Sequence, residues 1–122
     1  MFKILIAEDE PDIRDLISLT LQFSGYSVVA AKDGVEAVEA AKNDTFDLIL
    51  MDVRMPRMTG YEACRILREN DTTKEIPIIF LSAKGQEFEV QAGLEAGADD
   101  YILKPFAPEI LTKKIEKVLQ KA

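Results

Sequence analysis

The sequence predicts an α/β fold, written (βα)5, in which helices cover both faces of a doubly wound, five-stranded parallel sheet in three layers. Five short runs of consecutive apolar residues recur along the chain, and segments with helical period separate them. Consecutive apolar positions are typical of strands that are buried on both faces. Alternating strands and helices with right-handed crossovers give an open parallel sheet. The strands are expected over residues 2–7, 26–31, 46–51, 76–81 and 100–103.

The connections between these runs carry helix signals. In residues 11–24, Pro11 suits a first helical turn and Gly25 suits a C-terminal stop. Asp33 followed by Glu36 resembles a capping arrangement. One stripe of the first helix holds Ile13, Leu16, Ile17, Thr20, Leu21 and Ser24. The other helices are expected over residues 33–42, 60–69, 87–96 and 108–120.

Composition points to one ordinary folded domain across residues 1–122. Hydrophobic residues make up 48% and charged residues 30%, which excludes a disordered or fibrous chain. Twenty-two acidic residues against 15 basic ones leave a net charge of −7, which repels phosphate backbones and anionic lipid. No Lys/Arg cluster offsets that charge, so we expect no direct nucleic-acid binding by this chain.

Cysteine and histidine content excludes other kinds of site. Cys64 is the one cysteine and the chain has no histidine, so an intramolecular disulfide and a Cys/His zinc site are both excluded. The N-terminus lacks the features of a signal peptide, and no apolar run approaches the roughly 20 residues of a membrane span. The sequence therefore predicts a cytoplasmic protein without membrane association.

Polar residues follow the predicted strands at the edge where ligands bind in open parallel sheets. These residues are Glu8, Asp9, Asp52, Ser82 and Lys104. Carboxylates of Asp9 and Asp52 within a few Å of each other repel by about 4 kcal/mol at an effective dielectric of 20. A positive group must therefore lie between them, and both a hard cation and Lys104 are available. Glu10 is expected to be an ordinary turn residue.

The residue types suit phosphoryl chemistry. Carboxylates with backbone carbonyls form the all-oxygen environment that Mg²⁺ prefers, and Lys104 offers a point charge to a phosphate. The chain has no P-loop and no glycine-rich nucleotide cradle, so the phosphate is not expected to belong to a bound nucleotide. A carboxylate beside Mg²⁺ can act as a nucleophile and become an aspartyl phosphate, and Asp52 is the natural candidate.

Four motifs make the chain similar to the receiver domains of bacterial two-component response regulators, the CheY-like family. They are IAEDE at 6–10, LILMDVRMPRMTG at 48–60, FLSA at 80–83 and KPF at 104–106, and the resemblance spans residues 2–121. It implies the flavodoxin-like strand order 2-1-3-4-5. It also implies a phosphorelay switch that a histidine kinase or phosphotransfer protein phosphorylates, and whose conformational change alters partner binding. Such a switch catalyses its own phosphorylation and dephosphorylation and is not otherwise an enzyme.

The resemblance also implies a role for each site residue. Asp52 would be the phosphoacceptor, and Ser82 and Tyr101 would be the switch residues. Mg²⁺ would be held by Asp9, Asp52 and the backbone carbonyl of Arg54, with Glu8 acting mainly through water. Ser82, the Ala83 amide and Lys104 would hold the phosphoryl oxygens. Pro105 stands where the family has a cis peptide.

The match has departures, and other readings stay open. Ala92 and Ile110 replace the charged pair of a common receiver dimer, so we expect a monomer or weak dimer. Arg54 and Lys84 are expected to set the phosphoryl lifetime. A Mg²⁺-dependent phosphatase is one alternative, but it needs an acid where this chain has Arg54. A phosphorylation-independent interaction module is another, and the complete set of site residues argues against it. The chain is either a whole regulator or part of a longer one.

Overall fold

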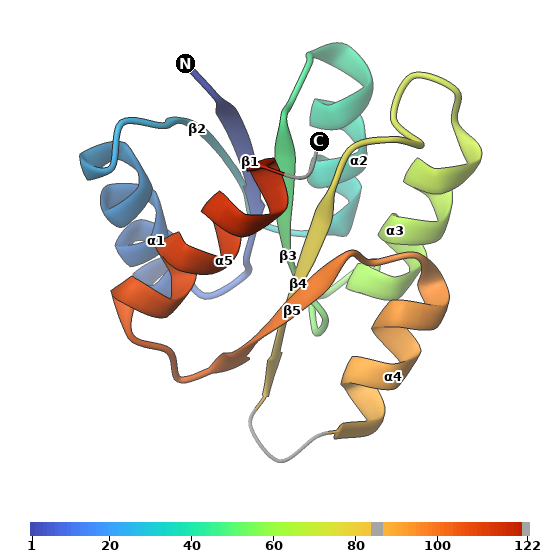
Figure 1. Ribbon diagram of the computed structural model, residues 1–122. Coiled ribbons are helices and arrows are strands. Elements are labelled where there is room, and N and C mark those ends of the chain that lie inside the picture. The colour runs from blue at the N-terminus through green and yellow to red at the C-terminus, as the bar shows by residue number, and fades with distance from the viewer. Residues whose placement is uncertain (84–86, 121–122) are drawn as a thin grey trace.

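The computed structural model describes residues 1–83 and 87–120, and this part of the chain forms five strands that alternate with five helices (Figure 1). The strands are β1 (Lys3–Ala7), β2 (Ser27–Ala31), β3 (Leu48–Asp52), β4 (Ile78–Ala83) and β5 (Asp100–Lys104). The helices are α1 (Pro11–Phe23), α2 (Gly34–Asn43), α3 (Gly60–Glu69), α4 (Glu87–Ala96) and α5 (Pro108–Gln120). All neighbouring strands are parallel, in the order β2-β1-β3-β4-β5. The predicted fold class and strand order are confirmed.

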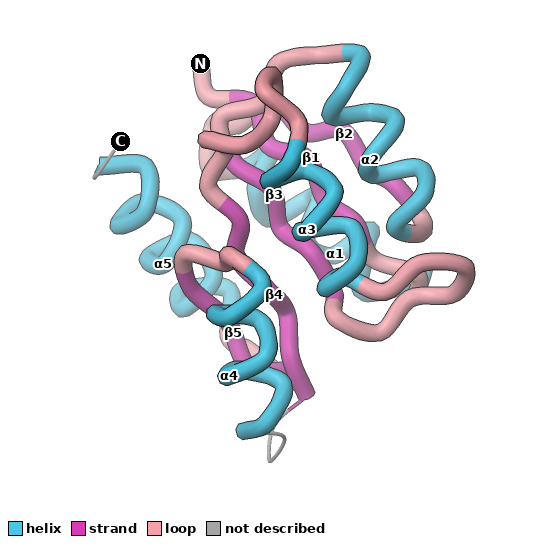
Figure 2. Tube along the Cα trace, turned by 90° about the vertical axis from the view of Figure 1, so that its right-hand side faces the viewer, coloured by secondary structure: helices cyan, strands magenta, loops and turns pink. Residues whose placement is uncertain are grey.

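The sheet has a separate core on each face, because alternate residues of its strands point in opposite directions. Ile17 of α1 and Ile115 of α5 pack with Ile4, Ile6, Leu48 and Leu50 on one face. Ala37 of α2, Leu67 of α3 and Ala96 of α4 share the other face with Leu5, Ile49, Met51 and Phe80. Figures 1 and 2 show the resulting three layers, with α1 and α5 on one side of the sheet and α2, α3 and α4 on the other.

Three strands extend further toward the site than their apolar runs predict. Asp52 ends β3 and pairs with Leu81, while Ala83 ends β4 and pairs with Lys104, which ends β5. The apolar runs also begin one or two residues before β1, β2, β3 and β4. Apolarity reports burial, whereas strand bounds depend on backbone pairing, which continues through polar residues. Asp52, Ser82 and Lys104 are therefore held within the ladder, whereas Glu8 and Asp9 follow the end of β1.

Local signals at the helix ends act largely as predicted. Gly25 follows α1 with a φ of 95°, a left-handed conformation that glycine adopts without strain. The Asp33 carboxylate accepts the Glu36 amide at 2.9 Å and caps α2. Within the predicted stripe of α1, Ile17 is buried but Leu16 is about half exposed. Among residues 1–83 and 87–120, no helix is long and apolar enough to cross a membrane.

Candidate functional site

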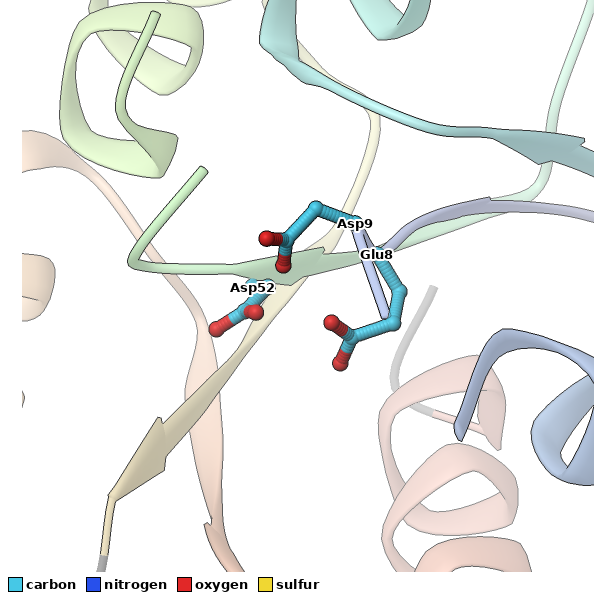
Figure 3. A group of neighbouring side chains, drawn as sticks. All are labelled: Glu8, Asp9 and Asp52. Carbon is cyan, nitrogen blue, oxygen red and sulfur yellow. The ribbon is translucent and has the colours of Figure 1, made fainter. Parts of the chain in front are cut away.

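Three acidic side chains meet where β1 and β3 end side by side in the sheet (Figure 3). One carboxylate oxygen from each of Glu8, Asp9 and Asp52 lies within 4.8 Å of the other two. Glu8 and Asp52 are buried, whereas Asp9 is accessible to solvent. The predicted convergence of these acids follows from the parallel pairing of their strands.

Gly60 fixes the path of the chain that leaves Asp52. Its amide donates to the Val53 carbonyl at 2.9 Å, so the segment between β3 and α3 turns back onto its own beginning. A Cβ atom at position 60 would collide with the Asp52 carbonyl oxygen, and this close approach requires glycine. Within the same turn the Arg54 amide donates to Asp52 Oδ1 at 3.3 Å. The turn therefore orients the Asp52 carboxylate and holds the backbone of Arg54 beside it.

Lys104 reaches the acids from the end of β5. Its Nζ donates to Glu8 Oε1 at 2.9 Å and to Asp52 Oδ2 at 3.2 Å. The peptide bond that follows, Lys104–Pro105, is cis, as the resemblance implies. In the described part of the chain, Lys104 is the one side-chain cation that contacts this pair of carboxylates. Of the two candidates for a balancing positive charge, the ammonium group is thus in place.

The charges of the site are not fully balanced. Burial, reinforced by Asp52, raises the pKa of Glu8 to about 7. Burial also raises the pKa of Asp52, against the opposing effects of its hydrogen-bonded neighbours. Burial disfavours the ammonium charge of Lys104, but the hydrogen bond to Glu8 and the field of Asp52 outweigh it and raise the pKa of Lys104. One ammonium shared by two buried carboxylates leaves negative charge that a second cation would compensate.

Ser82 and Ala83 bring hydrogen-bond donors to the same edge. Ser82 is buried in β4, and among the residues described its hydroxyl has no hydrogen-bond partner. A buried polar atom without a partner is unfavourable by about 1–3 kcal/mol, and an oxygen that came within hydrogen-bonding distance of the hydroxyl would remove this cost. The residues around the acids enclose a cavity of about 320 Å³. It is lined by Asp9, Glu10, Asp52, Arg54, Ala83, Glu89 and Lys104.

Glu89 also lines this cavity, and no motif or spacing in the sequence predicts it there. Its buried carboxylate accepts from Arg54 Nε at 2.7 Å and from the Ala83 amide at 3.3 Å. An acidic residue in the first turn of a helix usually faces solvent, and nothing in the sequence distinguishes Glu89 from Glu87. Its part in the site appears only when α4 is placed against β4.

Two other residues named from the sequence lie apart from this cavity or are not placed. Tyr101 on β5 is half-buried against the core beneath α2, α3 and α4, with Lys114 Nζ 5.1 Å from its ring centroid. Among the residues that the structure describes, no hydrogen bond or ion pair joins the Tyr101 side chain to Glu8, Asp9 or Asp52. The role of Tyr101 as a switch therefore stays a prediction. Lys84, expected to influence phosphoryl lifetime, lies outside the described residues.

Comparison with known proteins identifies the family. Residues 4–116 match the family model of the response regulator receiver domain. The chain belongs to this family. It is 41% identical over 120 residues to the alkaline phosphatase synthesis transcriptional regulatory protein PhoP of Bacillus subtilis, and 44% identical over 121 residues to the response regulator ArlR of Staphylococcus saprophyticus. The alignments cover 98% and 99% of this receiver chain but 49% and 54% of those proteins, so it spans about half their length.

Solved receiver structures share the whole fold. The chemotaxis response regulator CheY4 of Vibrio cholerae superposes with a TM-score of 0.92 at 40% identity, covering 97% of this chain and 98% of that one. The receiver domain of the sensor histidine kinase PA1611 from Pseudomonas aeruginosa gives a TM-score of 0.91 at 34% identity, covering 98% of each chain. That structure has a magnesium ion coordinated in its active-site cleft.

Proposed function

We propose that Asp52 is the phosphorylation site of this receiver domain and that the phosphoryl group comes from a histidine kinase or phosphotransfer protein. The observation that carries the proposal is the placement of the Asp52 carboxylate. It ends a buried strand 3.2 Å from the Lys104 ammonium, clusters with two further carboxylates and faces a cavity. Membership in the receiver family supports a phosphoacceptor role for this arrangement.

The same residues suit Mg²⁺. Asp9, Asp52 and the backbone carbonyl of Arg54 would bind the ion directly, and Glu8 would act mainly through water. Three carboxylates with oxygens within 4.8 Å of one another provide the hard ligands that this cation prefers, and their charge is only partly met by Lys104. When bound, the ion supplies positive charge that offsets the charge of the phosphoryl oxygens. Magnesium in the Pseudomonas aeruginosa receiver structure supports this assignment.

The chemistry that remains for the protein is nucleophilic attack and electrostatic positioning. An Asp52 carboxylate oxygen forms the new bond to phosphorus while the bond from phosphorus to the donor's imidazole nitrogen breaks, and that nitrogen keeps the electron pair. Lys104, the Ser82 hydroxyl and the Ala83 amide hold the phosphoryl oxygens, whose charge is spread over three atoms. The unpartnered Ser82 hydroxyl supports its part in this set.

The product links chemistry to signalling. A phosphoryl group replaces a monoanionic carboxylate with a group of charge near −2 that has three acceptor oxygens. Ser82 moves toward it, space opens behind β4, and Tyr101 turns inward, so that the surface presented to a partner changes. The domain is a switch and not an enzyme with a separate substrate. A phosphatase would need an acidic residue two positions after Asp52 to protonate the leaving group. This position holds Arg54, which pairs with Glu89.

We further propose that residues 1–122 form one receiver domain that acts in the cytoplasm as a monomer or weak dimer. The absence of the charged pair at Ala92 and Ile110 supports the weak self-association. The chain spans about half the length of the curated relatives that it matches. We therefore assign no downstream partner to this domain by itself.

The test is intact-protein mass spectrometry after incubation with acetyl phosphate and Mg²⁺. The wild-type chain should gain one acid-labile phosphoryl group, and Asp52→Asn should gain none. Asp33→Asn is the matched control, because Asp33 is also a buried aspartate at this edge of the sheet and should leave the adduct intact. An adduct of equal yield in Asp52→Asn would place the acceptor elsewhere.

A further inference from the structure

We propose that Glu89 is an internal competitor of the phosphoryl group: its carboxylate occupies the Ala83 amide, and Arg54 holds it there until phosphorylation displaces it. The Arg54–Glu89 pair would thus be a latch that keeps the unphosphorylated state closed. This inference rests on the proposed function of Asp52 and adds an opposing contact made by helix α4, which the acceptor chemistry does not require.

Burial shows that the Glu89 contacts are specific. The residue is 2% exposed, although it lies in the first turn of a helix at the protein surface. Each of its two carboxylate oxygens has a partner, Oε2 with Arg54 Nε at 2.7 Å and Oε1 with the Ala83 amide at 3.3 Å. A buried carboxylate requires such partners, because an unpaired charge in the interior is strongly unfavourable. Glu89 is therefore held in the cavity and is not a solvated side chain.

Competition follows from the position of the Ala83 amide. Ala83 directly follows Ser82 at the end of β4, and it lines the same cavity as Asp52 and Lys104. One backbone N–H cannot fully satisfy both the Glu89 carboxylate and a phosphoryl oxygen. A phosphoryl group of charge near −2 on Asp52 would also repel the Glu89 charge in the shared cavity. Glu89 must consequently leave the amide when the phosphoryl group arrives.

The surroundings allow this movement without unfolding of α4. The Arg54 side chain is 68% exposed, so Arg54 can follow or release Glu89 toward solvent at little cost in packing. The Glu89 backbone is tied separately, because the Tyr61 hydroxyl donates to its carbonyl at 3.1 Å. Tyr61 in turn packs edge-on against Phe80 of β4, with ring centroids 5.6 Å apart. A rotation of the Glu89 side chain can therefore open the latch while the helix stays attached.

The experiment measures the affinity of the protein for beryllofluoride, a phosphoryl mimic, by calorimetry in excess Mg²⁺. Glu89→Gln removes the charge and weakens the pairing with Arg54, so we expect binding about tenfold tighter than wild type, a difference of about 1.4 kcal/mol. Glu95→Gln is the matched control. It makes the same charge change on an exposed face of α4, where Glu95 accepts from Gln91, and its affinity should stay within about twofold of wild type.

A double-mutant cycle tests the latch itself. If Arg54 acts by holding Glu89, Arg54→Ala should change the affinity for beryllofluoride in the wild-type background. The same substitution should change that affinity much less when Glu89→Gln is already present. The amide proton of Ala83 provides a structural readout before any ligand is added. Its NMR resonance should move upfield in Glu89→Gln, because a hydrogen bond to a charged acceptor is lost, and should not move in Glu95→Gln.

The outcomes separate this inference from the proposed function. If wild type binds beryllofluoride and Glu89→Gln binds it equally or more weakly, the latch is wrong although Asp52 remains the acceptor. If wild type neither binds the mimic nor accepts a phosphoryl group from acetyl phosphate, the proposed function itself fails. Should circular dichroism show that Glu89→Gln is unfolded, Glu89→Asp replaces it. The shorter side chain cannot span from Arg54 to the Ala83 amide, so tighter binding is again expected and unchanged binding overturns the latch.

Discussion

Two buried acidic sites lie at the carboxyl edge of the sheet, after the neighbouring strands β2 and β1, and the pKa values of their carboxyls shift in opposite directions. Asp33, just after β2, accepts from Arg57 Nε at 3.0 Å and from the Glu36 amide at 2.9 Å. The hydrogen bond from Arg57, with that of the Glu36 amide, lowers the pKa of Asp33. Glu8 and Asp52 instead share Lys104, and burial raises the pKa of both carboxyls. Low solvent exposure alone therefore does not set the direction of the pKa shift. Asp33 has the Arg57 guanidinium to itself, whereas desolvation outweighs the one ammonium that Glu8 and Asp52 share.

One chain segment serves both sites. The turn between β3 and α3 begins beside Asp52 and reaches Asp33 through Arg57, whose φ of 67° is a left-handed conformation unusual for a residue with a side chain. Such a conformation is unfavourable by roughly 1 kcal/mol and persists where surrounding contacts hold it. The fully balanced acid thus anchors the turn. The Arg57–Asp33 pair holds the far part of the turn, while the part beside Asp52 is held separately by the hydrogen bonds of the Gly60 and Arg54 amides.

The largest expected difference between the two sites is how the ionisation of their acids changes the free energy of unfolding as the pH rises. The pKa of Glu8 is about 7 in the folded chain and near 4.5 when unfolded, so folding favours its neutral form. That contribution is complete below about pH 4.5 and is lost as the pH rises through 7. With metal removed by a chelator, Glu8→Gln should therefore be as stable as wild type near pH 4.5. At pH 8 its free energy of unfolding should be higher than that of wild type, by on the order of 2–3 kcal/mol.

Denaturant unfolding at a series of pH values checks this expectation, with Asp33→Asn as the comparison. The lowered pKa of Asp33 gives a contribution that is present above the unfolded pKa and is lost as the pH falls. Asp33→Asn should then be less stable than wild type at pH 8, with the difference vanishing in acid. A pH-independent effect of Glu8→Gln would mean that Lys104 fully balances the pair, and the contrast between the sites would be broken.

A smaller difference between the two sites is expected in how substitutions at each of them change the affinity for Mg²⁺. Asp9 is the solvent-accessible member of the cluster, so its charge contributes to cation binding with little rearrangement of the buried pair. We expect Asp9→Asn to weaken Mg²⁺ binding about tenfold, equivalent to about 1.4 kcal/mol of lost stabilisation at saturating wild-type conditions. Asp33→Asn should bind Mg²⁺ as wild type does. Calorimetric titration measures both, and equal weakening by the two variants would show that only overall charge matters.

The sequence predicts the scaffold of this site well, for identifiable reasons. Runs such as LILM before Asp52 are buried on both faces, which fixes parallel strands, and parallel strands bring Glu8, Asp9 and Asp52 to one edge. The pattern also places Asp33 as a helix cap. These features depend on burial and local hydrogen bonding, which residue types reveal directly.

Which charged residues form ion pairs with each other could not be predicted in the same way. The sequence has many acids and bases, and pairs such as Arg54–Glu89 and Arg57–Asp33 join residues 35 and 24 positions apart. Which of them meet depends on how α4 and the β3–α3 turn pack, to within a few Å. Apolar patterning does not fix positions that finely. Strand ends were missed by one or two residues for a related reason, since pairing at Ala83 and Lys104 continues after the apolar run stops.

The smallest expected effect separates the two roles of Asp33. Asp33→Ala removes both the cap of α2 and the partner of Arg57, and should lower the unfolding free energy by about 1 kcal/mol. Asp33→Asn keeps a side-chain oxygen for the Glu36 amide and should lose only part of that amount. Phosphorylation by acetyl phosphate should continue in both variants, because neither change touches the Glu8–Asp52 pair. If Asp33→Ala instead abolished phosphorylation while the chain stayed folded, Asp33 would be part of the acceptor site, and the division into an anchoring acid and a reactive pair would have to be given up.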